Sequence, residues 1–380
     1  MPITVVAAEP IEGRVRSDLA IVSSLGAHLV GNYVLVRVAD ADGHVGLGEA
    51  SVTSVWSGET QTGCITLIRE VLAPMVVGAD PFDSEWIGRR LEKAAFANSF
   101  ARAALEMALL DLQGQILKVP AYKLLGGRDR PVVPTEPGVR LQYVLGSDRG
   151  LRLKFVIGMV EPAVAAERAA AMVGKGWRAI KVKVGLDVAA DAERLRVVRR
   201  AIGPDVFLSV DANGGYTVDQ AVAAARRFEQ VDVALFEQPT RRGDHQAMAE
   251  VRARCGLPVM ADESVFTAQD VLEVIRHRAA DVLSLYPGKH GGIRATLALA
   301  RLAEAAGIVC TIGSNLEREV ATAAMAHVAV TSPNIVCERF PGDLIGPLYF
   351  ERPLTAAPLR YQADRLFVPE SPGLGVRLPG

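Results

Sequence analysis

A (β/α)8-type barrel with an α+β capping domain is the fold class that this sequence of 380 residues predicts. From about residue 153 onward, short apolar runs alternate with Ala- and Arg-rich amphipathic stretches. The first third has a different pattern, in which a hairpin is followed by a long helical stretch. The length also fits, because a barrel takes about 250 residues and leaves enough chain for a second domain.

The first third begins with two strand-like runs, 33–39 and 44–50, joined by a turn at Asp42-Gly43. An Asp-Gly pair between two such runs predicts a β-hairpin. From 59 to 118 apolar residues recur at spacings of three and four, which predicts helix. One apolar helix face is expected to contain Phe96, Phe100, Ala103, Ala104, Met107 and Leu110.

The middle of the chain supplies eight apolar runs separated by helical stretches, which predicts a closed parallel barrel. A doubly wound sheet is the alternative, and we rank it lower because no glycine-rich phosphate loop follows the first run. The predicted strands are 153–160, 178–184, 206–212, 233–237, 258–262, 281–286, 308–313 and 335–338.

The domain boundaries follow from these changes of pattern. We place the capping domain at 1–130, a (β/α)7β-type barrel at 131–344, and a C-terminal segment at 345–380 that returns to the cap. The Pro-rich stretch 131–150 is expected to lead into the barrel.

Composition excludes several classes of protein. Half of the residues are hydrophobic, and the net charge of −1 is spread along the chain, so neither a nucleic acid nor a membrane surface is expected as a partner. The four cysteines have no metal-binding spacing and indicate a reduced, cytoplasmic protein. We expect no signal peptide and no membrane span.

Polar residues recur where the predicted barrel strands end. Asp211, Glu237 and Asp262 end three successive strands, at spacings of 26 and 25 residues. A single Asp after a strand is usually a helix N-cap. Three in consecutive βα units point instead to one rim, where carboxylate oxygens would hold Mg²⁺, or Mn²⁺ in its place.

The preceding strand ends in Lys181-Val182-Lys183, and side chains two apart on a strand share a face. Two ammonium groups inside a barrel need nearby negative charge. A neighbouring ammonium group also lowers the pKa of a lysine, which turns lysine into a base near neutral pH. Alternatively, the two lysines are core residues that merely pair with Asp211 and Glu237. The favoured reaction is removal of the proton next to a substrate carboxylate by Lys183, with a metal-stabilised enediolate.

These motifs resemble the enolase superfamily, and within it the mandelate racemase/muconate lactonizing enzyme family. The resemblance spans nearly the whole chain. It rests on the helical stretch 103–112, the run 120–127, Lys-x-Lys at 181–183, Val-Asp-Ala-Asn at 210–213, Glu-Gln-Pro at 237–239, Ala-Asp-Glu-Ser at 261–264 and Gly-Gly-Ile at 291–293.

The resemblance implies a modified TIM barrel in which Asp211, Glu237 and Asp262 bind the metal and Lys183 is the base, with Lys181 beside it. The absence of a His after the seventh strand and the Lys-x-Lys pair are similar to the muconate lactonizing subgroup. It further implies a small carboxylate substrate, and we expect a homo-oligomer of between two and eight copies.

One position departs from the subgroup pattern. A second acid/base lysine usually lies five residues before the Gly-Gly pair, and Tyr286 stands there. Lys289 is the nearest lysine, in a segment expected to be a solvated loop. Chemistry on one face of the enediolate is therefore favoured: first a cycloisomerase of the muconate or sugar-acid-lactone type, then a syn dehydratase of an acid sugar. A racemase or epimerase of an amino-acid derivative is a further alternative. Tyr286 could still donate a proton to a leaving group.

Substrate contacts are expected from two cap loops and from the barrel rim. The loops are 17–32, with Ser24 and His28, and 50–58, with Trp56; each would otherwise be ordinary surface. On the rim we expect Asn213 and Glu317, although Glu317 could instead cap the next helix. Two other readings of the whole chain stay open: a barrel that has lost catalysis and acts as a scaffold, and an unrelated aldolase with a Schiff-base lysine.

Overall fold

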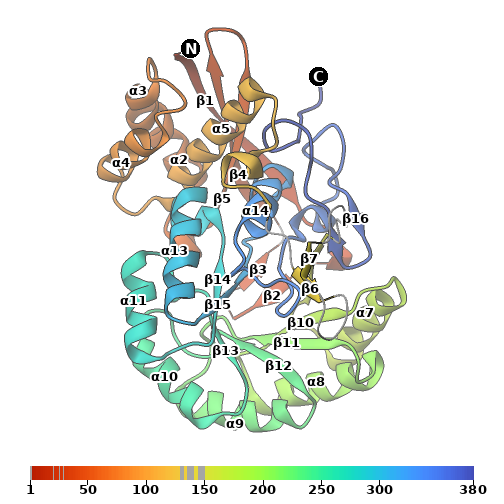
Figure 1. Cartoon of the computed structure of the whole chain (residues 1–380). Coiled ribbons are helices and arrows are strands. Elements are labelled where there is room, and N and C mark those ends of the chain that lie inside the picture. Colours follow the sequence, from red (N-terminus) through yellow and green to blue (C-terminus); the bar gives the residue numbers. More distant parts are fainter. Residues whose placement is uncertain are drawn as a thin grey trace.

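Seven parallel strands, hydrogen-bonded in chain order, form a curved sheet at the centre of the larger half of the molecule (Figure 1). The structure is a computed structural model that describes residues 2–19, 21–24, 26–28, 30–128, 132–134, 141–143 and 150–380. Nearly all strand residues are buried, as expected for a parallel sheet covered on both faces. The strands are β9 (Phe155–Ile157), β10 (Ala179–Lys183), β11 (Phe207–Asp211), β12 (Val233–Glu237), β13 (Val259–Ala261), β14 (Val282–Leu285) and β15 (Val309–Ile312).

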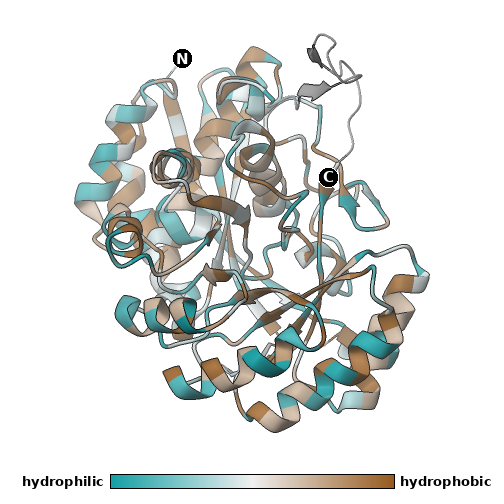
Figure 2. Cartoon of the chain, turned by 60° about the horizontal axis from the view of Figure 1, so that its bottom comes forward, coloured by the Kyte–Doolittle hydropathy of each residue, from teal (hydrophilic) through white to brown (hydrophobic). Residues whose placement is uncertain are grey.

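Helices follow the strands, and most of them are amphipathic and cover the outside of the sheet with their hydrophilic side outward (Figure 2). The helices Pro287–His290 and Glu319–Thr331 are instead buried along all or nearly all of their length. Thr217 and Thr267 start two of them with capping boxes, in which the hydroxyl accepts a backbone N–H and the side chain three residues on accepts the N–H of the cap. The helices are α7 (Pro162–Gly174), α8 (Val188–Ile202), α9 (Val218–Glu229), α10 (His245–Arg254), α11 (Ala268–His277), α12 (Pro287–His290), α13 (Ile293–Ala305) and α14 (Glu319–Thr331).

The barrel closes through irregular chain rather than an eighth strand. The predicted strand 335–338 is wrong as a strand, because only a single parallel bridge, Cys310 to Ile335, forms there. The chain that follows this segment nevertheless joins the two sheet edges: Asp343 N–H donates to the Ile312 carbonyl of β15, and Lys154 N–H donates to the Gly342 carbonyl. The predicted barrel class is confirmed, with seven regular strands.

The capping domain is built on an antiparallel sheet of β1 (Ile3–Arg14), β4 (Val30–Asp40) and β5 (Val45–Val52), which confirms the predicted hairpin. The long helix α5 (Ser99–Leu117) packs on this sheet. Gly48 permits the close approach, because a Cβ atom there would lie 1.8 Å from the carbonyl oxygen of Ala104.

The predicted apolar helix face is correct except at its first residue. Phe96 lies in the turn before α5 and is 94% exposed, whereas Phe100 is fully buried. The smaller cap elements are η1 (Ser17–Leu19), β2 (Ile21–Ser23), β3 (Gly26–His28), α1 (Ser54–Ser57), α2 (Gln61–Leu67), the π-helical turn η2 (Ile68–Leu72), α3 (Ala73–Val76), α4 (Ser84–Ala94) and α6 (Ala121–Leu124).

The C-terminal segment contacts both halves of the molecule. Its N–H at Leu374 donates to Asp111 of α5, and β17 pairs with β8 at the start of the barrel. The exact domain boundaries remain a prediction, and most of the stretch 131–150 lies outside the described residues. The remaining elements are β6 (Val132–Pro134), β7 (Leu141–Tyr143), β8 (Leu151–Arg152), η3 (Gly346–Tyr349), β16 (Tyr361–Gln362) and β17 (Arg365–Leu366).

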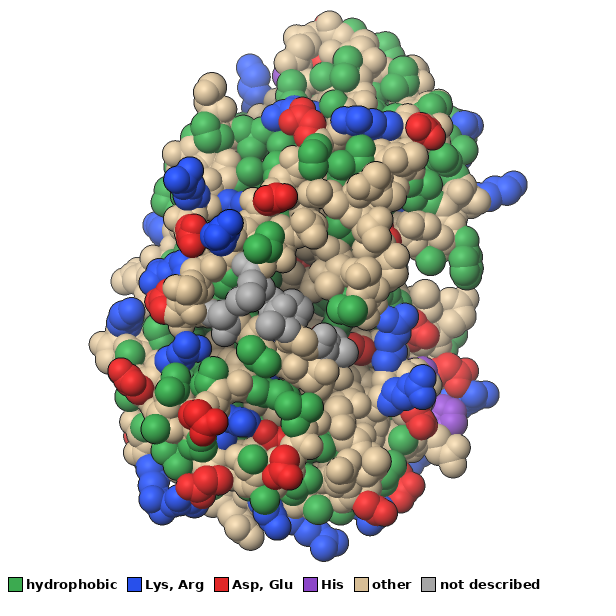
Figure 3. Space-filling model, turned by 180° about the vertical axis from the view of Figure 1, so that it is seen from behind, with side chains coloured by type: hydrophobic (Ala, Val, Ile, Leu, Met, Phe, Trp, Pro, Cys, Tyr) green, Lys and Arg blue, Asp and Glu red, His purple; other side chains and the backbone are tan. Residues whose placement is uncertain are grey.

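The surface shows no segregation of charge on the face drawn in Figure 3, where acidic and basic side chains are interspersed. This distribution agrees with the net charge of −1. All four cysteines are free thiols. Among the described helices, none is long and apolar enough to cross a membrane.

Candidate active site

Adjacent strands bring the predicted site residues into one layer. The register pairs Lys183 of β10 with Asp211 of β11, and Asp211 with Glu237 of β12. Asp262 follows β13 directly. Since neighbouring strands lie about 4.8 Å apart, the ends of β10 to β12 present these side chains side by side at the carboxyl rim of the barrel.

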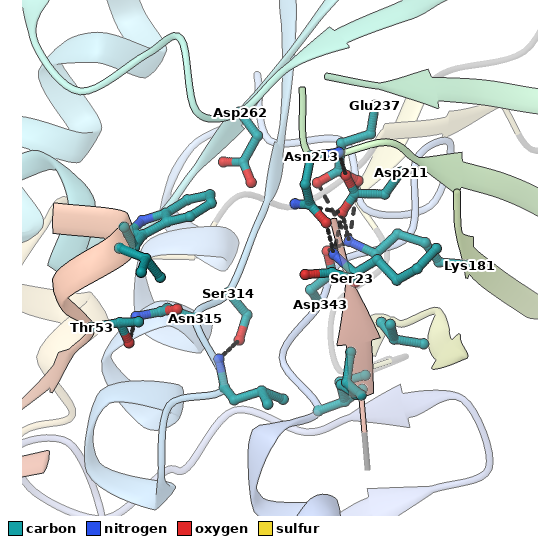
Figure 4. Close-up of a pocket in the computed structure, with 17 residues that line it drawn as sticks. Ser23, Thr53, Lys181, Asp211, Asn213, Glu237, Asp262, Ser314, Asn315 and Asp343 are labelled. Carbon is teal, nitrogen blue, oxygen red and sulfur yellow. Dashed lines mark hydrogen bonds and ion pairs between the residues drawn. The ribbon is translucent and has the colours of Figure 1, made fainter. Parts of the chain in front are cut away.

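A cavity lies between this rim and the cap. Barrel residues line it together with cap residues of β2, α1 and the turn before α1 (Figure 4). The lining residues are Ile21, Ser23, Thr53, Val55, Trp56, Val156, Lys181, Lys183, Asp211, Asn213, Glu237, Asp262, Ser314, Asn315, Leu316, Asp343 and Ile345.

Lys183 faces this cavity with the end of its side chain. Its Nζ atom donates to Asp211 Oδ2 at 2.5 Å and to Asn213 Oδ1 at 2.9 Å. The side chain is 13% exposed, more than the buried lysines Lys154, Lys181 and Lys289, which are at most 5% exposed. Lys183 is therefore the best placed of the four to meet a substrate.

Lys181 is held by three carboxylates. Its Nζ atom lies 2.7 Å from Asp343 Oδ2, 3.1 Å from Glu237 Oε2 and 3.3 Å from Asp211 Oδ2. Burial alone would lower the pKa of Lys181, but these negative charges outweigh it and raise the pKa well above its usual value. Lys181 therefore fits the alternative interpretation, in which the lysines are core residues that pair with buried carboxylates. Lys183 is less buried than Lys181 and fits that interpretation less well.

The carboxylates around the cavity have opposed pKa shifts. Burial would raise the pKa of Asp211, but Lys183 and Lys181 hold it at about 2. Burial and then the charge of Asp211 raise the pKa of Glu237. Burial, followed by the charges of Asp262 and Asp211, likewise raises the pKa of Glu263. Several buried acids that repel one another form a donor set suited to a divalent cation.

An unpartnered oxygen supports the same conclusion. Glu263 Oε1 accepts from Asn213 Nδ2 at 2.8 Å, whereas Oε2 is buried without a hydrogen-bond partner. The oxygens of the three predicted ligands do not, however, gather into one compact group. The Lys181 ammonium group bridges Glu237 and Asp211, and Lys289 binds Asp262. Asp262 stands apart from the other two in Figure 4.

A different trio, Asp40, Asp42 and His44, has ligand atoms within 4.8 Å of one another, and no other such group occurs in the described chain. Asp40 Oδ1 accepts the N–H groups of Asp42 and His44, and Oδ2 lies 2.8 Å from His44 Nδ1. These bonds close the turn between β4 and β5, which explains the cluster without an ion.

The expectation of a solvated loop at Lys289 is wrong. The residue lies in α12, is fully buried, and donates to Asp262 Oδ1 at 2.5 Å and to the carbonyl oxygens of Ser284 and Asp262 at 2.7 and 2.9 Å. These three bonds account for all of its protons. Its geometry fixes Asp262 and gives it no access to the cavity.

Tyr286 is also fully buried and does not line the cavity. Its hydroxyl makes no hydrogen bond of regular geometry, although the indole N–H of Trp56 acts on it as a donor that lowers its pKa, and the hydroxyl of Ser284 has no partner. Burial and then the charge of Asp262 raise the pKa of Tyr286 well above its usual value. A neutral phenol at this place can donate a proton but is a poor base.

The predicted substrate-contact residues fall into three groups. Trp56 and Asn213 line the cavity, as expected. Ser24 points elsewhere, because its hydroxyl donates to the carbonyl oxygens of Ala212 and Asn213, and the adjacent Ser23 lines the cavity instead. The side chain of His28 lies outside the described residues.

Glu317 lies behind the cavity wall. Its carboxylate accepts from Ser51 and Ser314 hydroxyls and from Asn315 N–H, so it holds Ser314 and Asn315 in the lining. The cap of α14 is the neighbouring Arg318. The predicted direct contact of Glu317 with substrate is therefore replaced by support of the two residues beside it.

Two charged residues near the cavity were not predicted from the sequence. Asp343 lines the cavity, and Lys154, fully buried, lies 3.1 Å from Asp343 Oδ2 and donates to the Pro341 carbonyl at 2.7 Å. Both lie where the barrel closes irregularly. The only signal in the sequence was the Lys inside the apolar run 153–160.

A parallel barrel with lysines and carboxylates at its strand ends, closed by an α+β cap, defines an acid/base enzyme of the barrel class. Two sequence models match the chain: "Mandelate racemase / muconate lactonizing enzyme, N-terminal domain" over residues 9–126 and "Enolase C-terminal domain-like" over residues 164–379. The chain belongs to the enolase superfamily, in the mandelate racemase/muconate lactonizing enzyme family.

Relatives in this family carry different activities. The chain is 33% identical to chloromuconate cycloisomerase of Cupriavidus pinatubonensis, over 91% of this chain and 88% of that protein. It is also 33% identical to hydrophobic dipeptide epimerase of Enterococcus faecalis, over 82% and 83%. N-succinyl-L-Arg/Lys racemase of Bacillus cereus is 30% identical over 91% and 87%.

Solved structures agree over the whole chain. The N-succinyl Arg/Lys racemase from Bacillus cereus superposes with a TM-score of 0.91 at 29% identity, covering 100% of this chain and 96% of that one. The muconate lactonizing enzyme from Pseudomonas fluorescens, complexed with muconolactone, gives 0.89 at 30% identity, covering 100% and 97%. The dipeptide epimerase from Enterococcus faecalis, complexed with Mg and the dipeptide L-Leu-L-Tyr, also gives 0.89 at 30%, covering 99% of each chain.

Proposed function

We propose that this enzyme removes the proton α to a substrate carboxylate, with Lys183 as the base. The observation that carries the proposal is the position of Lys183. It lines the cavity, is the most exposed of the four lysines around the rim, and stands beside Asp211 in a cluster of repelling carboxylates. A lysine there can take a proton from a carbon held above the rim.

We propose Mg²⁺ as the cofactor, held by Asp211, Glu237 and Asp262, with Mn²⁺ as a substitute. When bound, the cation would stabilise the negative charge that develops on the substrate carboxylate. The unpartnered Glu263 oxygen and the repulsion that raises the pKa of Glu237 support a cation at this place. The Mg in the Enterococcus faecalis dipeptide epimerase structure gives further support.

The other lysines position the cluster. Lys181 stays protonated between Glu237 and Asp343, and so supplies a fixed positive charge next to the base. Lys289 fixes the orientation of Asp262 from below. Asn213 connects the base to Glu263, because its amide binds both.

The favoured reaction is a cycloisomerisation that uses one face of the enediolate, with a syn dehydration of an acid sugar as the nearest alternative. Two observations favour it: Tyr286 replaces the usual second lysine, and burial keeps this phenol neutral. A racemase or epimerase of an amino-acid derivative is the second candidate, favoured by the names of two relatives. We further propose a cytoplasmic enzyme that forms homo-oligomers.

The proposal is tested by solvent-deuterium exchange. A panel of carboxylic acids, including lactones, acid sugars and acylated amino acids, is incubated with enzyme and Mg²⁺ in deuterium oxide, and α-deuterium is followed by NMR. Wild-type enzyme should exchange at least one class. Lys183→Ala should keep its circular dichroism spectrum and lose exchange by several powers of ten. A Lys183→Ala enzyme that exchanges normally would exclude this role for Lys183, and borohydride trapping would then test a Schiff base.

A further inference from the structure

The distribution of charge around the cavity restricts the substrate more narrowly than the reaction does. Resting on the proposed function, we infer that the substrate is a monocarboxylate whose remaining part is uncharged, offers an N–H or O–H donor to Asp343, and is apolar further out. A second carboxylate or a free ammonium group in that part would be disfavoured.

All charged lining residues belong to the barrel side of the cavity. In Figure 4, Lys181, Asp211, Glu237 and Asp343 gather on one side, and Thr53 and Asn315 stand on the other. Within the described lining, the cap contributes no charged side chain. A substrate carboxylate therefore has its electrostatic partners at the strand ends, and a second charged group would have none at the cap.

Asp343 is the one lining carboxylate that is not a predicted metal ligand, and its negative charge is already balanced by lysines. Its Oδ2 atom lies 2.7 Å from Lys181 Nζ and 3.1 Å from Lys154 Nζ, both buried. A substrate ammonium group at Asp343 would be a third cation at the same carboxylate, and like charges at this distance repel strongly in a buried site.

The second oxygen of Asp343 lacks a hydrogen-bond donor, which a neutral group of the substrate would supply once the side chain turned toward the cavity. Oδ1 is buried and has no hydrogen-bond partner, which is costly for a carboxylate oxygen. An amide N–H or a hydroxyl would satisfy it without adding charge.

The far side of the cavity suits an apolar group. Val55, Trp56 and Leu316 supply it, and Val55 is 63% exposed, so it stands at the opening. A second cavity adjoins there and shares Val55 and Leu316 with the first.

The adjoining cavity does not add a free charge. Glu59 is its single charged lining residue among those described, and both of its oxygens accept backbone N–H groups, from Phe100 and Ala101, at 3.0 Å. Its remaining lining is neutral. Burial of a second substrate charge along this path would leave that charge without a partner, which costs binding free energy.

Three compounds with the same reacting end test the inference: N-acetyl-leucine, N-succinyl-leucine and alanyl-leucine. Each has the leucine carboxylate, α-proton and amide N–H, and they differ in the far charge, which is zero, negative and positive. We expect kcat/KM for deuterium exchange to be at least tenfold higher for N-acetyl-leucine than for N-succinyl-leucine or alanyl-leucine. Calorimetry with Mg²⁺ present should give the same order of binding.

A cation placed at the opening of the cavity should reverse the order of the neutral and the negatively charged compound. Val55→Arg is expected to favour N-succinyl-leucine over N-acetyl-leucine, whereas the matched neutral variant Val55→Gln should keep the wild-type order. Preference of wild-type enzyme for either charged compound overturns the inference, as does a screen in which the best-exchanged acid carries a second carboxylate or an ammonium group. Failure of the proposed function would give a different result. In that case Lys183→Ala would still exchange the α-proton of whichever acid the screen finds.

Discussion

The ammonium group of Lys289 lies 2.5 Å from Oδ1 of Asp262 and donates its other two hydrogen bonds to the backbone carbonyl oxygens of Ser284 and Asp262. A fully buried lysine is tolerated there because each proton has an acceptor. The consequence is that the end of β13 and the start of α12 are joined at a proposed metal ligand.

Lys289→Met should therefore weaken Mg²⁺ binding by about 10- to 100-fold, the usual effect of losing a residue that orients a ligand. Calorimetry with Mg²⁺ alone measures it. Lys175→Met, the same substitution at an exposed lysine, is the matched control and should bind Mg²⁺ like wild type. Unchanged affinity in Lys289→Met would contradict a positioning role.

Glu237→Gln should remove most Mg²⁺ binding, because one of three proposed carboxylate ligands loses its charge. The substitution keeps the size of the side chain, so the circular dichroism spectrum should be retained. Glu193→Gln on the exposed face of α8 is the control for the loss of one negative charge. If both variants bind Mg²⁺ as wild type does, the cation is held elsewhere.

The sequence predicted the position of a site residue correctly where the backbone around that residue is regular. Lys183, Asp211 and Glu237 end regular strands, and the alternation of side chains places them correctly from sequence alone. Asp343 lies where the barrel closes without a ladder, so no periodicity marks it. Ser24 was chosen over Ser23 because nothing in the sequence shows which of two adjacent side chains faces inward.

Lys289 was misplaced for a different reason. Pro287 and Gly288 indicate a turn, and turns are usually exposed. Here the turn is a short helix beneath α5, where Gly288 is needed because a Cβ atom would lie 2.6 Å from the Phe100 ring. Packing between the two domains, which the local sequence does not encode, decides the burial of this lysine.

Tyr286 should restrict the enzyme to one face. Only one enantiomer of a chiral substrate is expected to exchange its α-proton, since a phenol whose pKa is raised by burial does not accept a proton near neutrality. Each enantiomer is incubated separately in deuterium oxide, and label and optical rotation are followed together. Exchange of both enantiomers with loss of rotation would instead support the racemase or epimerase alternative.

The same experiment has a gain-of-function arm. Tyr286→Lys restores the residue that the subgroup usually carries, and it should add exchange of the second enantiomer. Tyr286→Phe removes only the hydroxyl, which makes no hydrogen bond of regular geometry, so it should leave the fold intact. A large loss of product formation in Tyr286→Phe, with exchange of the first enantiomer retained, would identify the hydroxyl as the proton donor to a leaving group.

His327 of α14 should make stability depend on pH. The ring is fully buried: Nδ1 accepts the Tyr122 N–H at 3.2 Å, so Nε2 must carry the proton that it shares with the Leu374 carbonyl, also at 3.2 Å. Burial lowers the pKa of His327 to about 4. The unfolded chain, with a histidine pKa of about 6.5, binds the second ring proton, the one on Nδ1, more readily than the folded chain does.

The sign follows from that difference. The contribution of His327 to the free energy of unfolding is complete above pH of about 6.5 and is lost as the pH falls through 4, by about 3 kcal/mol. Urea unfolding of wild type and His327→Gln at several pH values between 7.5 and 4 measures it. The stability gap between the two proteins should shrink by about this amount on acidification, while His277→Gln, at a partly exposed histidine, should run parallel to wild type. A gap for His327→Gln that stays constant with pH would mean that the ring already takes up its proton in the folded protein.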